Sequence, residues 1–504
     1  MEILASLTKG FGVALTPVNL LFTLIGTAAG TVIGVLPGIG PVAGVAMLIP
    51  FSYGMNPTTA MIMMAGVYYG AMYGGSTTAI LLNLPGESSS VVTCLDGYQM
   101  ARQGRAGPAL GMAAFSSFIG GTLSVVGLMV LAPLLAAFAL RFGPPEYFAL
   151  ALLGITLITS LGGRSPLKGL LAGAFGVFLG TLGTDPMSAV ERYTFDQAFL
   201  ADGLSFVSVS VGLFAVAEVL ENAERGLQAT VPRQAIANLL PTLPDWVASR
   251  WAILRGAVIG FVIGVLPGAG ATIASLVSYT VEKRCSRHPE RFGTGVIEGV
   301  AAPEGANNAA TGGALVPLLT LGIPGSGTTA VMLGALMIQG LRPGPLLFER
   351  QPDFVWGLIA SMYVGNVMLL VLNLPLVGLW ARLLTVPSRV LLPLILTFSV
   401  VGVFSVSNHV GEVWVMLGFG VIGYGMRKAH IPAAPVVLAL VLTPLLETAL
   451  QQSLQMSRGS FGILFTRPIA GALMAAAALS LALPLLPALR RTRARLEALS
   501  SPGR

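Results

Sequence analysis

Long apolar stretches, seldom interrupted by a charge, follow one another along most of the 504-residue chain. Many of them approach or exceed the roughly 20 residues that a helix needs to cross the hydrocarbon core of a bilayer. They are too continuous for the strands of a membrane β-barrel, which alternate in hydrophobicity over about ten residues. Separating the stretches at their Gly and Pro interruptions predicts an all-α polytopic membrane protein with roughly 12 to 14 embedded segments.

The interruptions occur in two copies. Residues 32–38 read Val-Ile-Gly-Val-Leu-Pro-Gly, and residues 262–268 repeat the same seven letters 230 positions later. A Gly-Gly pair follows at 74–75 and at 312–313, and a Pro-Gly pair follows at 85–86 and at 324–325. Matching glycines precede the two tips, at Gly26, Gly30 and Gly34 and at Gly256, Gly260 and Gly264. Ordered matches at nearly constant spacing indicate one duplicated unit.

We therefore predict two structural repeats, each with a re-entrant helical hairpin, a broken transmembrane helix and plainer scaffold helices. In the first repeat (1–222) these lie at about 17–50, about 58–100 and 108–222. In the second repeat (251–487) they lie at 251–280, about 294–341 and 346–487. Residues 223–250 would link the repeats and could form an interfacial helix, and residues 488–504 would form a basic tail.

The segment 251–280 has basic residues on both sides, with Arg250 and Arg255 at its start and Lys283 and Arg284 after it. If both flanks are cytoplasmic, the segment enters and leaves on one side. Two full spans would need about forty residues, whereas two arms of about 13 residues reach roughly two-thirds of the way across. This pattern predicts a hairpin whose Leu-Pro-Gly tip lies inside the membrane.

The basic residues change places between the repeats. They follow the second hairpin, in the loop 283–291, but the equivalent loop 51–57 has no charge. Conversely, Arg102 and Arg105 follow the first broken segment, where the second has only Arg342. This reversal predicts inverted repeats, with the first hairpin opening to the periplasm and the second to the cytoplasm. The arginines of the tail place the C-terminus in the cytoplasm.

Composition narrows the function. The chain is 54% apolar and 10% charged, far below the roughly one-quarter charged residues of a soluble protein. Its net charge of +7 comes from residues scattered over short loops, which indicates a lipid bilayer as the partner and not nucleic acid. Its two cysteines follow no metal or disulfide spacing. Its three dispersed histidines form neither a catalytic set nor a metal cluster, which weighs against an enzyme.

The two helix breaks predict a site for an anion. Pro and Gly free backbone groups at membrane depth, and such groups persist only against protein or a watery cavity. The helix N-termini that follow would present N–H groups and positive dipole ends to a carboxylate. A single Pro-Gly break could be a simple kink, but the duplicated pair with its hydroxyls favours a site. The candidate substrate-binding residues are Asn83, Pro85, Gly86, Glu87, Ser88, Ser89, Ser90, Asn307, Asn308, Pro324, Gly325, Ser326, Thr328 and Thr329.

Glu87 has two interpretations at this stage. It could cap the helix that follows the first break, or it could join the site itself.

The hairpin tips and one acid are candidates for coupling to a cation. Carbonyl groups freed at the tips are hard oxygen ligands of the kind that a small cation takes. The candidate cation-coupling residues are Gly34, Leu36, Pro37, Gly38, Gly264, Leu266, Pro267, Gly268 and Glu304. For the glycines, close helix packing is the simpler explanation.

Glu304 belongs to the second repeat alone, and an ionisable group within a span is a functional candidate. Its spacing to Asn307 and Asn308 puts the three on one face of a continuous helix. The alternative is an interhelical hydrogen bond, while Glu298 is placed nearer the membrane interface. These residues do not choose between Na⁺ and H⁺ as the coupling ion, and no other cofactor is expected.

Three motifs resemble a known family. The doubled Gly-Val-Leu-Pro-Gly, the run 73–90 and the run Ala-Pro-Glu-Gly-Ala-Asn-Asn-Ala at 302–309 are similar to the large membrane subunit of the tripartite tricarboxylate transporters, the TctA family. The resemblance covers nearly the whole chain. It implies a secondary transporter of the bacterial inner membrane that imports citrate-like or other organic carboxylates on a sodium or proton gradient, with an elevator-like movement.

The same resemblance implies two partners, a small four-helix membrane subunit (TctB-like) and a periplasmic solute-binding protein (TctC-like) that delivers the substrate. Two other functions stay open from the residues: a passive anion channel with the same repeats, and a membrane-embedded hydrolase. The hydrolase would need a base near its serines, and no His lies near them.

Overall fold

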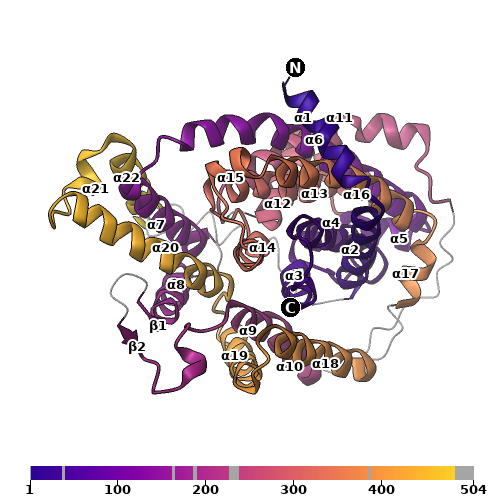
Figure 1. Cartoon of the computed structure of the whole chain (residues 1–504). Coiled ribbons are helices and arrows are strands. Elements are labelled where there is room, and N and C mark those ends of the chain that lie inside the picture. Colours follow the sequence, from indigo (N-terminus) through magenta and orange to yellow (C-terminus); the bar gives the residue numbers. More distant parts are fainter. Residues whose placement is uncertain are drawn as a thin grey trace. The chain divides into compact units, whose positions relative to one another are not determined.

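The computed structural model describes residues 2–36, 40–161, 165–185, 190–225, 238–268, 270–383 and 388–482. The predicted all-α membrane class is confirmed (Figure 1). Within the described residues the strands are β1 (Gly183–Thr184) and β2 (Glu191–Arg192), a short antiparallel pair. Six described helices are long and apolar enough to cross a membrane. They cover Pro17–Val35, Ala106–Ala139, Phe206–Glu224, Leu243–Val265, Pro352–Asn373 and Ala434–Met456.

The chain divides into two compact units that cut across the sequence repeats. Unit 1 comprises residues 1–136 and 218–398, and unit 2 comprises residues 137–217 and 399–504. Each unit therefore takes one segment from each repeat. Both hairpins and both broken helices belong to unit 1, so all the candidate site residues lie in that unit.

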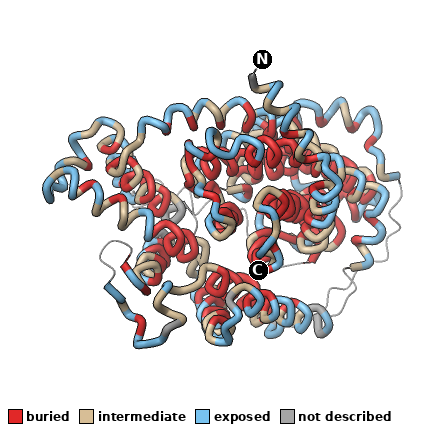
Figure 2. Tube along the Cα trace, in the orientation of Figure 1, coloured by how far each residue is buried: buried red, intermediate tan, exposed pale blue. Residues whose placement is uncertain are grey.

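Unit 1 is built from these helices of the first repeat: α1 (Glu2–Ala14), α2 (Pro17–Val35), α3 (Gly40–Leu48), η1 (Pro50–Ser52), α4 (Pro57–Leu82), η2 (Ser88–Val91), α5 (Thr93–Arg102) and most of α6 (Ala106–Ala139). From the rest of the chain it takes most of α10 (Ala217–Arg225), then α11 (Leu243–Val265), α12 (Gly270–Cys285), η5 (Pro289–Arg291), α13 (Glu298–Leu321), α14 (Gly327–Ile338), α15 (Pro345–Arg350), α16 (Pro352–Asn373), α17 (Val377–Leu383) and the first half of α18 (Ser388–Ser407). Figure 2 shows α4 and α13 buried along almost their whole length.

The first arm of each hairpin is longer than the predicted length of about 13 residues. The first arms, α2 and α11, have 19 and 23 residues, and the second arms, α3 and α12, have 9 and 16. At about 1.5 Å per residue, α11 is long enough to cross the hydrocarbon core, so the prediction of two half-length arms was wrong for it. The error came from treating Arg250 and Arg255 as a flank outside the membrane. They lie within α11, and Arg255 donates to both carboxylate oxygens of Glu282 on α12, at 2.7 and 2.8 Å.

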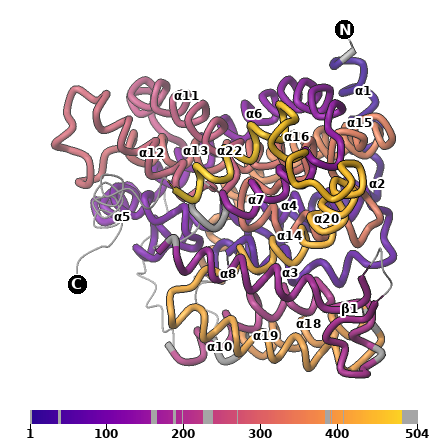
Figure 3. Tube along the Cα trace, turned by 90° about the vertical axis from the view of Figure 1, so that its left-hand side faces the viewer, coloured from indigo at the N-terminus to yellow at the C-terminus, as the bar shows by residue number. Residues whose placement is uncertain are grey.

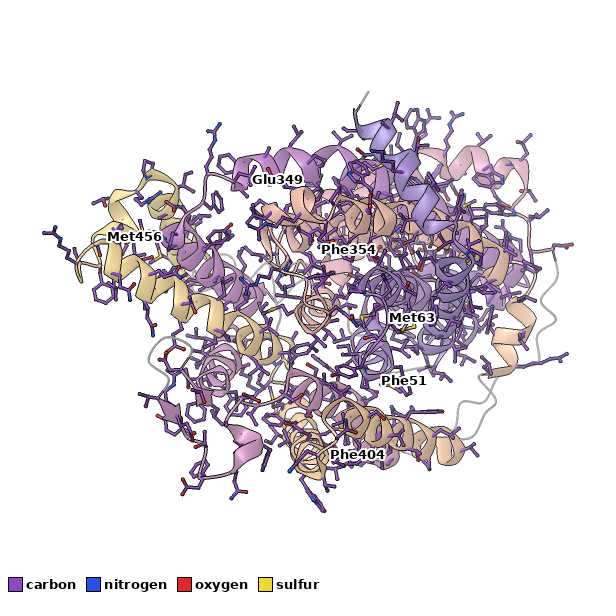
Figure 4. The ribbon with its side chains drawn as sticks, in the orientation of Figure 1. Phe51, Met63, Glu349, Phe354, Phe404 and Met456 are labelled. Atoms are coloured by element: carbon purple, nitrogen blue, oxygen red, sulfur yellow. The ribbon has the colours of Figure 1, made fainter. Side chains whose placement is uncertain are left out.

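Within each repeat the first hairpin arm packs on the first half of the broken helix through glycines. A Cβ at Gly256, Gly260 or Gly264 would overlap the carbonyl oxygen of Ala302, Ala306 or Ala310. The first repeat has the same contacts, in which Gly26, Gly30 and Gly34 face the carbonyls of Met63, Val67 and Ala71. Met63 is labelled among these helices in Figure 4, and Figure 3 shows α11, α12 and α13 together. The packing role of the glycines is therefore confirmed.

This packing also corrects the alignment of the repeats along the broken helices. Gly74 lies against Thr31 and Gly34, and Gly313 lies against Phe261 and Gly264. Gly74 is thus the equivalent of Gly313, and the equivalent of Gly75 is Ala314. The Gly-Gly pairs are shifted by one residue relative to the predicted match.

Replacing Gly260 by alanine is expected to destabilise the chain by about 1–3 kcal/mol, because the methyl group forces α11 away from α13. The measurement is thermal unfolding of the purified chain in detergent. Gly12→Ala is the matched control, since a Cβ there meets nothing within 4 Å and α1 should gain from the substitution. Equal midpoints for Gly260→Ala and Gly12→Ala would contradict the packing interpretation.

Unit 2 takes the ends of α6 and α18 and contains α7 (Pro144–Leu161), α8 (Pro166–Gly180), η3 (Ala198–Leu200), α9 (Phe206–Val211), the π-helical turn η4 (Gly212–Val216), α19 (Val410–Lys428), α20 (Ala434–Met456), α21 (Ile463–Thr466) and α22 (Pro468–Ala482). Helix α20 packs on α7 and α8. Two ion pairs hold its loops, Arg467 with Glu146 at 2.7 Å and Arg192 with Glu447 at 2.6 Å. The predicted tail 488–504 lies outside the described residues.

Candidate functional site

The two broken helices end and restart with matching backbone conformations. Helix α4 ends at Asn83 (φ 56°, ψ 28°) and α13 ends at Gly322 (φ 71°, ψ 21°), both in the left-handed region. The chain then restarts from extended residues, Glu87 (φ −142°, ψ 168°) and Ser326 (φ −151°, ψ 170°). The predicted breaks are therefore present in both repeats, with equivalent residues at the end and at the restart. The first restarts in the 3-10 turn η2 and the second directly in helix α14.

Each restart is closed by a capping box. The Ser326 hydroxyl accepts from the Thr329 N–H at 3.3 Å, and the Thr329 hydroxyl accepts from the Ser326 N–H at 2.8 Å. In the first repeat a carboxylate of Glu87 accepts from the Ser89 N–H at 2.7 Å, and the Ser90 hydroxyl accepts from the Glu87 N–H at 3.4 Å. Glu87 therefore caps the first restart, as the first of its two interpretations predicts. The equivalent caps differ in charge, one a carboxylate and the other a hydroxyl.

The repeats contact each other reciprocally at these caps. Tyr68 of α4 lies 3.0 Å, hydroxyl to hydroxyl, from Ser326 of the second repeat. Asn307 of α13 donates to Glu87 Oε1 at 3.2 Å and accepts from the Ser89 hydroxyl at 2.6 Å, both in the first repeat. In the corrected alignment Tyr68 is the equivalent of Asn307. This exchange is the pattern expected of two repeats related by a pseudo-two-fold axis.

One hydroxyl pair at the breaks lies on exposed residues. The hydroxyls of Ser88 and Thr272 lie 2.9 Å apart, and both residues are exposed. Thr272 belongs to the second hairpin, so this pair also joins the repeats. Asn83 is exposed as well, and its side chain makes no hydrogen bond with the described residues. Among the predicted donors, Asn83 and Thr328 are those whose side chains make no hydrogen bond with the described residues, and Thr328 is buried.

The hairpin tips lie directly against the breaks. The Gly268 N–H donates to the Gly325 carbonyl at 3.0 Å. A Cβ on Gly86 would overlap the Gly34 carbonyl, so the tip and the break of the first repeat also touch. Leu36 is buried there, whereas Leu266 is 53% exposed. The predicted tip residues Pro37 and Gly38 lie outside the described residues.

Glu304 lies in a separate polar cluster, away from the tips. Its side chain is fully buried, and it accepts from the hydroxyls of Ser76 (2.5 Å), Thr93 and Ser117 (3.4 Å), which come from α4, α5 and α6. No hydrogen bond joins Glu304 to the described tip residues. The cation-coupling candidates therefore fall into two groups among the described residues, the tip residues and Glu304 with its three hydroxyl partners.

Asn307 and Asn308 follow Glu304 on a continuous helix, as predicted, but they turn to different partners. Asn307 reaches the first cap. Asn308 donates to the Glu304 carbonyl at 3.4 Å, and its buried Oδ1 has no partner among the described residues.

Neither buried carboxylate has a basic partner. The described ion pairs all lie elsewhere, for example Arg105 with Asp245 at 2.6 Å. A buried charge without a partner is costly, so each of Glu87 and Glu304 must be neutralised by a proton or a cation. No cluster of three or more His, Cys, Asp or Glu occurs among the described residues. A transition-metal centre of the usual ligands is therefore not formed by them.

Sequence reasoning missed five residues that complete these clusters: Tyr68, Ser76, Thr93, Ser117 and Thr272. Tyr68 had a usable signal, because it aligns with Asn307 once the broken helices are matched through the two Pro-Gly pairs. The hydroxyls had none, since Ser and Thr are common in membrane helices and bond to their own backbone.

The comparison with known families agrees with this architecture. Residues 20–438 match the model described as the tripartite tricarboxylate transporter TctA family. The chain belongs to the TctA family. It is 46% identical over 493 residues to an "Uncharacterized 52.8 kDa protein in TAR-I ttuC' 3'region" of Agrobacterium vitis, which covers 98% of each chain.

A second Agrobacterium vitis relative, described as an "Uncharacterized protein in TAR-II ttuC' 3'region", is 45% identical over 234 residues, which is 46% of this chain and 97% of the relative. No solved structure matches the chain. Membership of the TctA family makes this chain the large, multi-pass membrane subunit of a tripartite tricarboxylate transporter.

Proposed function

We infer that this TctA-family subunit imports organic carboxylates across the bacterial inner membrane by cation-coupled symport. Membership of the family supports an organic carboxylate as the substrate. The paired helix breaks support a carrier mechanism, because irregular backbone at membrane depth is retained where it lines a substrate path. The observation that carries the proposal is the reciprocal contact of the two breaks through Tyr68 with Ser326 and Asn307 with Glu87.

The second break is the better receptor for the substrate's carboxylate. Helix α14 has 12 residues, and the N–H groups of Gly327 and Thr328 precede its first intrahelical hydrogen bond, which Ala330 donates to Ser326. The cap there is the neutral Ser326, next to the Tyr68 hydroxyl. At the first break the equivalent cap is the carboxylate of Glu87, which favours a cation or a proton there. Residues 324–329 therefore contact the anion, and residues 85–90 complete the opposite wall.

The division into units supports an elevator-type movement. Both breaks and both hairpins lie within unit 1, so a substrate held there could travel with that unit alone. In this proposal the small TctB-like subunit and the periplasmic TctC-like binding protein complete the system, and the binding protein selects the acid. The C-terminus faces the cytoplasm.

The test is uptake of radiolabelled citrate into proteoliposomes that contain this chain, its small subunit and its binding protein. Sodium and proton gradients are imposed separately. Accumulation above equilibrium with one gradient is the expected result. Equilibration without accumulation would favour the passive channel instead, and appearance of a hydrolysed product would favour an enzyme.

A further inference from the structure

A small cavity with a mixed polar and apolar lining lies beside Glu304, at a place that the sequence did not indicate. Its volume is about 10 Å³, enough for one water-sized particle. It is lined by Tyr73, Ser76, Thr77, Leu110, Ala113, Ala114, Ser117 and Asn373, from α4, α6 and α16. The polar residues of this lining bring together oxygen atoms from three helices of unit 1.

Asn373 supplies an oxygen that lacks a partner. The residue is 6% exposed, and its Oδ1 accepts no hydrogen bond from the described residues. The orientation of the side-chain amide is fixed by its nitrogen, because Nδ2 donates to the Leu369 carbonyl at 2.9 Å. A buried carbonyl oxygen left in this way is energetically costly unless the cavity holds something that it can bind.

Two further lining residues connect the cavity to a negative charge. The hydroxyls of Ser76 and Ser117 both donate to Glu304 Oε2, at 2.5 and 3.4 Å. A hydroxyl has one hydrogen, so once it is directed at the carboxylate its lone pairs are left for another ligand. The cavity thus offers neutral oxygens backed by one buried carboxylate that has no basic partner.

We propose that this cavity binds one dehydrated sodium ion, held by Asn373, Ser76 and Ser117 and balanced by Glu304. Hard oxygen donors suit such a cation, and the single carboxylate balances one positive charge. The volume admits one particle of the size of water, which excludes an ion that keeps its hydration shell. The few oxygens of the lining favour sodium over potassium, which takes more ligands. This inference rests on the proposed function, because it names the coupling ion and moves its site from the hairpin tips to α4, α6 and α16.

The test measures binding without transport. The full-length chain is purified in detergent, and its thermal unfolding midpoint is titrated with NaCl at constant ionic strength set by choline chloride, with KCl in parallel. A ligand that binds only the folded state raises the midpoint with its concentration. We expect a saturable rise with NaCl that KCl does not reproduce. Ser117→Ala and Asn373→Leu should each raise the half-saturating sodium concentration about tenfold or more, as expected for a lost ligand.

Ser116→Ala and Ser361→Ala are the matched controls. Both are buried serines outside the cavity lining; Ser116 lies on α6 with Ser117, and Ser361 lies on α16 with Asn373. Both variants should show the same sodium dependence of the unfolding midpoint as the parent chain. Equal midpoints in sodium and choline, or unchanged titrations of Ser117→Ala and Ser76→Ala, would overturn the proposal even if Asn373→Leu failed to fold. Citrate accumulation on a proton gradient without sodium binding would reject this site and leave the proposed transport function standing.

Discussion

Replacing Ser326 by aspartate is expected to reduce carboxylate uptake roughly 100-fold or more while the chain keeps its fold. Aspartate caps a helix as well as serine does, so α14 should still begin at Gly327. It also places a negative charge where the substrate's carboxylate is proposed to bind, and like charges placed together cost several kcal/mol. The measurement is the initial rate of citrate uptake in proteoliposomes, with the unfolding midpoint as the check on folding.

Asn56→Asp is the matched control for this variant. Asn56 caps α4 by accepting from the Thr58 N–H at 2.9 Å, and it is exposed. The substitution adds the same charge to another helix cap of unit 1 and should leave uptake unchanged. Normal uptake by Ser326→Asp would move the anion site away from the second break.

Replacing Glu304 by glutamine is expected to stop accumulation of substrate, with a loss of roughly 100-fold or more. Glutamine keeps the size of the side chain and can still pair with Ser76, Thr93 and Ser117. It carries no charge, however, so it can neither balance a cation nor take up a proton, and coupling to either gradient is lost. Concentrative uptake under an imposed gradient is the measurement.

Glu298→Gln removes a charge from the first turn of the same helix, where the residue is partly exposed, and should retain uptake. Accumulation by Glu304→Gln at the parental level would show that Glu304 is only an interhelical hydrogen-bond partner.

The features that could be predicted are those that the chain repeats. Pro85-Gly86 and Pro324-Gly325 occur in equivalent apolar contexts, and their effect on a helix is local, so the breaks were found to within a residue or two. Close packing at Gly260 and its equivalents followed from spacing alone, because small residues four apart lie on one helix face.

The features that could not be predicted depend on partners that are distant in sequence. Arg255 was assigned to a flank because its partner Glu282 on the second arm was not known. Glu304 was grouped with the tips, although its hydroxyl partners come from three other helices. Asn373 was not singled out at all. Asn373 is a candidate ligand because its side-chain oxygen is unpaired and the residue lines a cavity, and no spacing along the chain reveals either property.

The reciprocal caps also constrain how the protein is made. Tyr68 and Ser326 are 258 positions apart, and Ser89 and Asn307 are 218 apart. At a translation rate of about 5–20 residues per second, the first broken helix waits roughly 10–50 seconds for its partner to leave the ribosome. During that interval the polar groups of Glu87 and Ser89 have no partner from the second repeat. The contacts between the repeats in unit 1 should therefore form only after the second repeat has been inserted. Until then the nascent first repeat is exposed to quality-control proteases.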